Sequence, residues 1–250
     1  MCDLSAADLL VGWERALGQS ADEQALTLLA VALPDAAPEA LARLTVGRRD
    51  AALLTLRERV FGPRLVSRTT CPSCGESLEL DFAAGDIRAS GSSSEAEGGG
   101  DEAALALTHS GYEVRFRLPN TLDVRAAGRA GTLQGARSAL LERCVLEAWR
   151  SGDTVLASAL PEAVREALAS RMVELEPEAD VRLALSCPAC GYDWQAPFDI
   201  GAYLWEELHA WALRTLHDVH LLARNYGWRE ADILALSPRR RQIYLDMVQG

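Results

Sequence analysis

The sequence predicts an α+β protein, with mostly helical N- and C-terminal parts and a small α+β insertion between two cysteine-bearing hairpins. Three observations predict this fold. The stretch "TTCPSCGESLELDF" (69–82) has a near copy in "LSCPACGYDWQAPFDI" (185–200). Apolar residues after each cysteine pair alternate with period two, as in a half-buried strand. Before the first copy and after the second, apolar residues recur instead with helical spacing.

Length and composition are those of an ordinary folded protein. The 250 residues are 49% hydrophobic and 24% charged, enough to bury a substantial core. No apolar run approaches the roughly 20 residues of a membrane span, and the start "MCDLSAADLL" lacks the basic and apolar parts of a signal peptide. We therefore expect a soluble, cytoplasmic protein. Its net charge of −11 disfavours nonspecific binding to nucleic acid or to anionic membranes.

Residues 1–64 are expected to form an N-terminal helical region. Ser5 is placed to cap a first helix, and Ser20 with Glu23 has the spacing of a capping box at the start of a second. The run "LTVGRRDAALLTLRERVFG" (44–62) predicts a third, longer helix.

Residues 65–88 and 181–200 are each expected to form a hairpin with a tight cysteine turn at its tip. Two residues between paired cysteines let one turn present both sulfurs to the same ion, and four thiolates complete the tetrahedral shell of a structural zinc. Gly75 and Gly191 follow the second cysteine of each turn, where we expect a positive φ. The predicted zinc ligands are Cys71, Cys74, Cys187 and Cys190.

The predicted zinc is structural, because four thiolates leave no coordination position open for water. The two hairpins would form one four-cysteine zinc ribbon that joins the helical parts and closes a loop of more than a hundred residues. A thioredoxin-like redox pair is the alternative, and it is disfavoured because the two pairs match and neither opens a helix. Cys144, in the helical run "ALLERCVLEAW", is expected to be a small buried apolar residue.

Residues 89–102 are rich in Gly, Ser and Glu and are expected to be a flexible linker.

Residues 103–180 form the predicted α+β insertion. It opens with a hairpin whose turn is Ser110-Gly111 and whose second strand alternates over 112–118. Helices are expected at 121–128, 133–150 and 161–175.

Residues 201–250 are expected to form a C-terminal helical region. Apolar positions of the predicted helix 202–226 share one face, and aromatic residues are concentrated in this part of the chain. Such aromatic residues suit a protein core, and they also suit a docking surface, since aromatic side chains dominate binding hot spots. The histidines of this helix are expected on or beside its solvated polar face: His209, His217 and His220.

The stretches "LTVGRRDAAL" and "LSPRRRQIYL" resemble each other and place arginines in the first turn of a helix. Positive charge there opposes the helix dipole, so other interactions must stabilise these arginines. Their stems could cover apolar surface while they pair with local acids. They could instead bind an acidic partner. The residues concerned are Arg48, Arg49, Arg240 and Arg241.

The sequence contains none of the common catalytic patterns. GxSxG, HExxH, a phosphate-binding glycine loop and a dinucleotide fingerprint are all missing. We therefore expect no catalytic residues and a protein that is not an enzyme.

Four parts of the chain carry a resemblance to a known family. They are "VGRRDAALLTLRERVFGPRL", the two CPxCG units, "VRFRLPNTLDV" and the tail "HLLARNYGWREADILALSPRRRQIYL". Together they resemble a protein encoded in gene clusters for contractile phage tails and phage-tail-like injection systems. Its members are often described as like the baseplate-hub assembly chaperone of T-even phages.

The resemblance implies a non-enzymatic role in building or completing the baseplate, through binding to baseplate or hub proteins. A permanent structural subunit is the main alternative. A zinc-ribbon regulator that binds nucleic acid is a third, disfavoured by the acidic charge balance. The partner-binding residues predicted from the tail and the aromatic segment are Trp205, Trp211, Tyr226, Trp228, Arg240 and Arg241.

Overall fold

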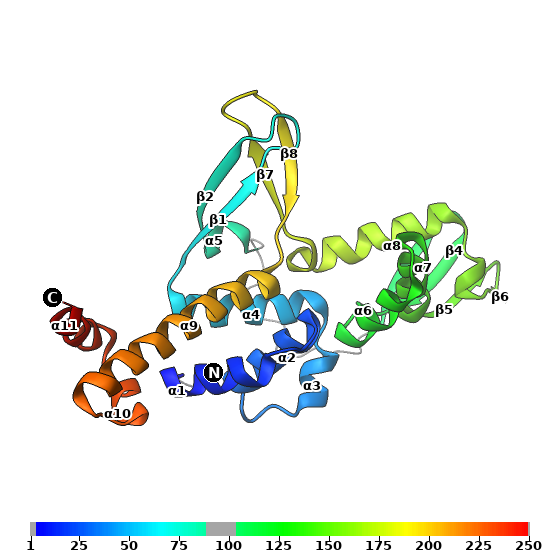
Figure 1. Ribbon diagram of the computed structural model, residues 1–250. Helices are drawn as coiled ribbons and strands as arrows, with labels where there is room; N and C mark the ends of the chain where they lie inside the picture. Colours follow the sequence, from blue (N-terminus) through cyan, green and yellow to red (C-terminus); the bar gives the residue numbers. More distant parts are fainter. Residues whose placement is uncertain (1–3, 89–103, 250) are drawn as a thin grey trace. The chain divides into compact units, whose positions relative to one another are not determined.

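The computed structural model describes residues 4–88 and 104–249, and it contains many helices and small antiparallel sheets (Figure 1). The predicted mixture of helix and sheet is therefore confirmed. The linker predicted at 89–102 lies outside the described residues.

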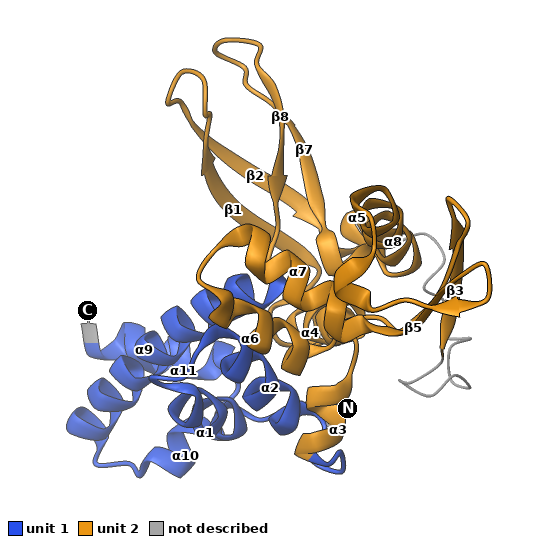
Figure 2. Ribbon diagram, turned by 90° about the vertical axis from the view of Figure 1, so that its right-hand side faces the viewer, with its two compact units in different colours: residues 1–37, 200–250 blue, residues 38–199 orange. Residues whose placement is uncertain are grey.

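Two compact units make up the chain (Figure 2). Unit 1 combines residues 1–37 with 200–250, and unit 2 spans 38–199. The predicted N-terminal helical region, 1–64, is thus divided between the two units.

Among its described residues, unit 1 consists of helices and the short segments that connect them. Both predicted N-terminal caps are present: the Ser5 hydroxyl and backbone pair with Asp8, and the backbone N–H of Ser20 donates to Glu23. The bonds are reciprocal at Ser5, and at both caps they satisfy backbone N–H groups that the start of a helix leaves unpaired. The helices are α1 (Ala6–Ala16), α2 (Ala21–Ala32), α9 (Ile200–Tyr226), α10 (Glu230–Leu234) and α11 (Pro238–Gln249).

Helices α1 and α2 pack against α9, and one polar contact lies within this packing. The indole N–H of Trp13 donates to Nδ1 of His209 over 3.0 Å, and the Trp205 ring lies 5.9 Å from the same imidazole. His209 is therefore half-buried among aromatic rings, which corrects the expectation of a solvated side chain. His217 and His220 are exposed, as predicted.

Unit 2 contains the remaining elements. Its helices are α3 (Pro38–Arg43), α4 (Val46–Phe61), α5 (Ala84–Ile87), α6 (Thr121–Ala127), α7 (Leu133–Cys144) and α8 (Glu162–Leu175), with short 3₁₀ turns that include η3 (Pro177–Asp180). Its strands are β1 (Arg64–Thr70), β2 (Ser77–Ala83), β3 (Leu105–His109), β4 (Tyr112–Phe116), β5 (Val145–Arg150), β6 (Asp153–Thr154), β7 (Arg182–Ser186) and β8 (Asp193–Pro197).

The insertion is built on an antiparallel sheet of order β3-β4-β5-β6. Its first hairpin has the predicted two-residue turn, with φ values of 51° at Ser110 and 78° at Gly111 that match the strand twist. Helices α7 and α8 supply most of the core that covers one face of this sheet. The buried core residues are Tyr112, Val114, Phe116, Leu141, Cys144, Ala148, Leu160, Val164, Leu168 and Met172.

The helix predicted over 133–150 is wrong in its second half. Helix α7 ends at Cys144, and Val145–Arg150 forms β5, which pairs with β4. Ala148 faces the core while Glu147 pairs with Arg115 on the opposite face of the sheet. The alternation of buried and exposed residues in β5 is short. The strand forms because it pairs with β4, which lies about thirty residues earlier in the chain. Cys144 is fully buried, as predicted.

The first turn of α4 is held by a carboxylate from a distant segment. Glu176 accepts hydrogen bonds from the Thr45 hydroxyl and, over 3.1 Å, from the backbone N–H of Gly47. The backbone N–H of Val46 donates to the carbonyl of Pro119 over 2.9 Å. Burial raises the pKa of Glu176 above its ordinary value, although the bonds from Thr45 and Gly47 oppose that rise. The loops before α6 and after α8 are thereby joined to α4.

Gly47→Ala is expected to destabilise unit 2 by about 1–3 kcal/mol, because overpacking a filled site forces its neighbours to move. A Cβ at Gly47 would lie 2.9 Å from Cβ of Glu176. Chemical denaturation followed by circular dichroism measures the change. Gly85→Ala is the matched control, because a Cβ there meets nothing within 4 Å. Equal stability of the two variants would contradict the close packing at Gly47.

Asp123 is the most completely buried carboxylate described, and its partners come from the segment between β4 and α6 and from the end of α7. Arg117, just after β4, pairs with both carboxylate oxygens at 2.5 and 2.9 Å, and Nε of Arg143 on α7 donates to one of them over 2.9 Å. The backbone N–H of Asn120 donates to Asp123, and the Asn120 side chain caps α6 in return. The motif "VRFRLPNTLDV" thus fastens the end of β4 to the start of α6 and the end of α7.

Candidate metal centre

The two cysteine units form two matching hairpins. Strands β1 and β2 pair from Arg64↔Ala83 to Thr70↔Ser77, and β7 and β8 pair from Arg182↔Pro197 to Ser186↔Asp193. The hairpins lie side by side, with their cysteine turns at the same end (Figure 1). The hairpin form of both units is as predicted, although β8 ends at Pro197 because α9 begins at Ile200.

The two turns have the same backbone geometry. In the first, the N–H of Gly75 donates to the Cys71 carbonyl over 3.0 Å, and φ of Gly75 is 78°. In the second, the N–H of Gly191 donates to the Cys187 carbonyl over 2.8 Å, and φ of Gly191 is 71°. The predicted positive φ is confirmed at both glycines. Because a side chain would strain this conformation, glycine is needed to bring both sulfurs of each turn to one side.

Four sulfurs meet at the tips of the hairpins. The sulfurs of Cys71 and Cys190 are 3.8 Å apart and those of Cys74 and Cys187 are 3.6 Å apart, and all four lie within 4.8 Å of one another. Cys71 and Cys187 are buried, whereas Cys74 and Cys190 are exposed. The structure therefore brings together every residue of the predicted ligand set, and the cluster could hold a metal ion.

The spacing of the sulfurs fits a tetrahedral ion. Zinc–sulfur bonds of about 2.3 Å arranged tetrahedrally would set neighbouring sulfurs about 3.8 Å apart, close to the two distances across the hairpins. Backbone N–H groups also point at the thiols. Burial raises the pKa of the Cys71 thiol, but hydrogen bonds from the N–H groups of Cys74 and Ser73, together with those from the thiols of Cys187 and Cys74, outweigh it and hold that pKa at about 7. Such N–H donors offset the negative charge of metal-bound thiolates.

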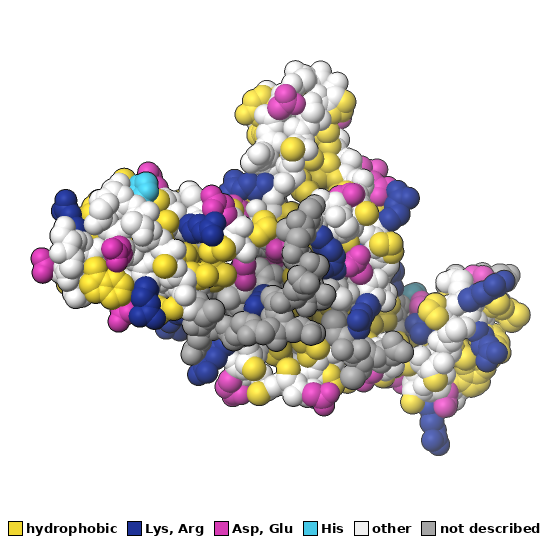
Figure 3. Space-filling view, turned by 180° about the vertical axis from the view of Figure 1, so that it is seen from behind, with side chains coloured by type: hydrophobic (Ala, Val, Ile, Leu, Met, Phe, Trp, Pro, Cys, Tyr) yellow, Lys and Arg dark blue, Asp and Glu magenta, His cyan; other side chains and the backbone are white. Residues whose placement is uncertain are grey.

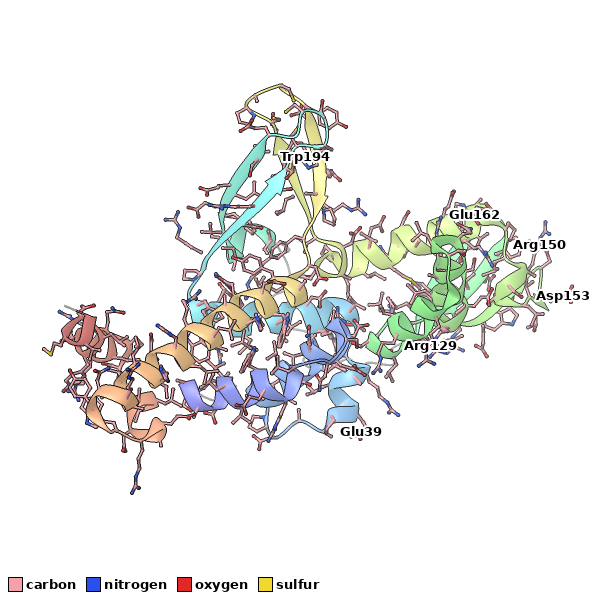
Figure 4. The ribbon with its side chains drawn as sticks, in the orientation of Figure 1. Glu39, Arg129, Arg150, Asp153, Glu162 and Trp194 are labelled. Carbon is pink, nitrogen blue, oxygen red and sulfur yellow. The ribbon has the colours of Figure 1, made fainter. Side chains whose placement is uncertain are left out.

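Aromatic side chains connect and support the hairpins. Phe82 at the end of β2 meets Phe198, just after β8, edge to face with ring centroids 5.6 Å apart. Near the second turn, Tyr192 stacks on Trp194 of β8, with ring centroids 6.2 Å apart. Figure 4 labels Trp194 on this hairpin. The last apolar residue of the alternating run after each cysteine pair, Phe82 or Phe198, therefore joins the two hairpins at the end away from the sulfur cluster.

The structure also places the six residues predicted to bind a partner, all of them in unit 1. Tyr226 and Arg240 are exposed. Three tryptophans are half-buried, and Trp228 lies in a core cluster with Val219, Leu222, Ile233 and Leu245. Arg241 is only 7% exposed, near the Asp218 carboxylate of α9. The partner surface stays a prediction, with Tyr226 and Arg240 its most accessible members.

The arginines in the first turn of α4 have local partners. Arg49 donates to Asp50 over 2.7 Å and to the hydroxyl of Thr121 over 3.4 Å, and the charge of Arg48 acts on Glu176. The interpretation that these arginines pair with local acids is therefore confirmed for α4.

Comparison with known protein families gives a match over most of the chain. The family described as T4 bacteriophage base plate protein matches residues 18–202, which include all of unit 2 and both cysteine turns. The chain belongs to this family.

The expected link to the phage baseplate is thereby confirmed. The base plate family match ends before most of α9, so the C-terminal tail motif lies outside it. No curated protein and no solved structure matches the chain. Among residues 4–88 and 104–249, no helix has both the length and the apolar character needed to cross a bilayer.

Proposed function

We propose that this base plate family protein is a non-enzymatic accessory factor that assists assembly of the baseplate or hub of a contractile tail, and that a structural zinc stabilises it. The match to the base plate family over residues 18–202 carries the proposal. The protein would act by binding baseplate or hub proteins. A permanent baseplate subunit is the second candidate, because the same family match favours it equally.

The proposed zinc rests on the sulfur cluster. Four thiol ligands at tetrahedral spacing suit Zn²⁺, which has no redox chemistry and favours closed four-sulfur shells in structural sites. When bound, the ion would add cross-links between two hairpins that are otherwise joined by few apolar side chains. Cys71, Cys74, Cys187 and Cys190 would hold it, and no position would remain for a substrate.

Mass spectrometry of purified tail particles and of assembly intermediates from the same cells tests the proposed role. We expect the protein to co-purify with incomplete baseplates and to be missing from finished particles. A fixed number of copies in every finished particle would instead establish a permanent subunit. Lack of association with either would overturn both candidates.

A further inference from the structure

Helix α11 has one face that packs inside unit 1 and one that does not. Leu245 is buried in the cluster with Leu222 of α9, and Arg241, four residues earlier on the same side, is buried as well. On the other side, the apolar side chains of Ile243 and Met247 are 47% and 66% exposed. These two residues are one turn apart, so they form a continuous apolar strip.

Two arginines extend this strip toward the start of the helix. Arg239 lies one turn before Ile243, and Arg240 lies at three- and four-residue spacing from Ile243 and Tyr244. Both arginines are exposed, and neither forms an ion pair with any residue in the described part of the chain. Exposed hydrophobic and arginine side chains lie next to one another at the end of unit 1 that holds α10 and α11 (right in Figure 3).

The charge of this region contrasts with that of the whole molecule. The chain carries a net charge of −11, yet α11 has three arginines and a single acidic residue, Asp246. Arginines in the first turn also oppose the helix dipole. The arginines at α4 are compensated by Asp50 and Glu176, whereas Arg239 and Arg240 have no such acid among the described residues. An acidic partner would supply the missing charge.

We infer that Arg239, Arg240, Ile243 and Met247, the α11 face, dock an acidic amphipathic segment of a baseplate or hub protein. This inference rests on the proposed function. An aromatic group fixes the edge of the face: Trp228 stacks on Tyr226 with centroids 4.7 Å apart, and Tyr244 meets Trp228 edge to face at 4.8 Å. Rigid aromatic side chains next to arginines are typical of binding hot spots.

A protein segment fits the α11 face better than nucleic acid does. Phosphate recognition needs several basic groups and gains nothing from exposed Ile243 and Met247. A segment with acidic and apolar residues would neutralise both arginines and cover both apolar side chains at once. The arginines would steer its approach, and the apolar contacts would slow its dissociation.

Site-specific photo-crosslinking tests the surface and the class of partner together. A photoreactive amino acid replaces Ile243 in one variant and Leu133, an exposed residue of unit 2, in the control. Both variants are produced in cells that assemble tail particles. We expect position 243, and not 133, to crosslink to an Asp- and Glu-rich peptide of a baseplate or hub protein. Crosslinks from position 243 to a second copy, to nucleic acid, to a non-acidic peptide or to nothing would overturn the inference.

A charge reversal gives an independent readout with the identified peptide. The pair Arg239→Glu and Arg240→Glu should raise the Kd for that peptide about tenfold or more, since like charges oppose one another across an interface. The matched control is Arg129→Glu, an exposed arginine of unit 2 (Figure 4). Unchanged affinity in a variant with normal circular dichroism would contradict the inference. If baseplate association survives in that variant, only the α11 face is wrong; if the wild type never associates, the proposed function fails.

Discussion

Asp123→Ala is expected to destabilise unit 2 by about 3 kcal/mol. Removing one partner of a buried ion pair leaves uncompensated charge, which typically costs about 3–5 kcal/mol. The lower end applies because the side chains of Arg117 and Arg143 are 20% and 46% exposed and can be partly hydrated. The side chain of Asp123 itself is 1% exposed. Chemical denaturation followed by circular dichroism measures the loss.

Asp81→Ala is the matched control for this prediction. Asp81 also pairs with an arginine, Arg64, but both side chains are well exposed on the first hairpin. Exposed ion pairs contribute about 0–1 kcal/mol, so this variant should be almost as stable as the wild type. If the two variants lose the same stability, Asp123 does not hold the insertion together.

The same carboxylate predicts a pH dependence. Burial raises the pKa of Asp123, but the bonds from Arg117, Asn120 and Arg143 outweigh it and hold that pKa below its ordinary value of 3.8. A depressed pKa in the folded state means that this contribution to stability is complete above about pH 4–5 and falls as the pH drops through the folded-state pKa. In the Asp123→Ala variant, the free energy of unfolding should no longer show this decrease at low pH.

Cys187→Ser is expected to abolish tight zinc binding and to destabilise both hairpins by about 4 kcal/mol at free zinc a thousandfold above its Kd. That figure follows because a ligand bound only by the folded state stabilises it by RT ln(1 + [L]/Kd). Cys187 is buried and supplies one of the two sulfurs of its turn. Amide hydrogen exchange in β1, β2, β7 and β8 measures the loss. EDTA should have the same effect on the wild type.

Cys144→Ala separates loss of a ligand from loss of any buried thiol. Cys144 is buried in the core of the insertion and is not part of the sulfur cluster. This variant should keep its zinc and its protection in the four hairpin strands. Equal loss of protection in the two cysteine variants would show that packing, and not the ion, holds the hairpins.

The local features of this fold could be read from the sequence because neighbouring residues determine them. The caps at Ser5 and Ser20 depend on an acid three residues later, and the cysteine turns depend on a glycine directly after the second cysteine. The repeated turn identified all four sulfur ligands, because each turn supplies two and a tetrahedral zinc ion needs four.

Features that depend on distant partners were missed. The short strand β5 follows α7 without a break. Its alternating pattern was therefore included in the predicted helix 133–150. The Asn120–Asp123 spacing signals a cap, but the pairing of Asp123 with Arg143 requires the folded sheet and helices. Arg240 and Arg241 look alike in the sequence. Only Arg241 lies on the buried side of α11, four residues before the buried Leu245. That spacing places the two side chains on one face of the helix, and it could have distinguished Arg241 from Arg240 in the sequence.

Native mass spectrometry of protein made in zinc-replete medium tests whether the four cysteines hold a zinc ion. We expect one zinc ion per chain, no disulfide bonds, and loss of the ion on acidification or in the Cys187→Ser variant. A metal-free chain, or one whose cysteines are oxidised in pairs within each turn, would contradict this expectation.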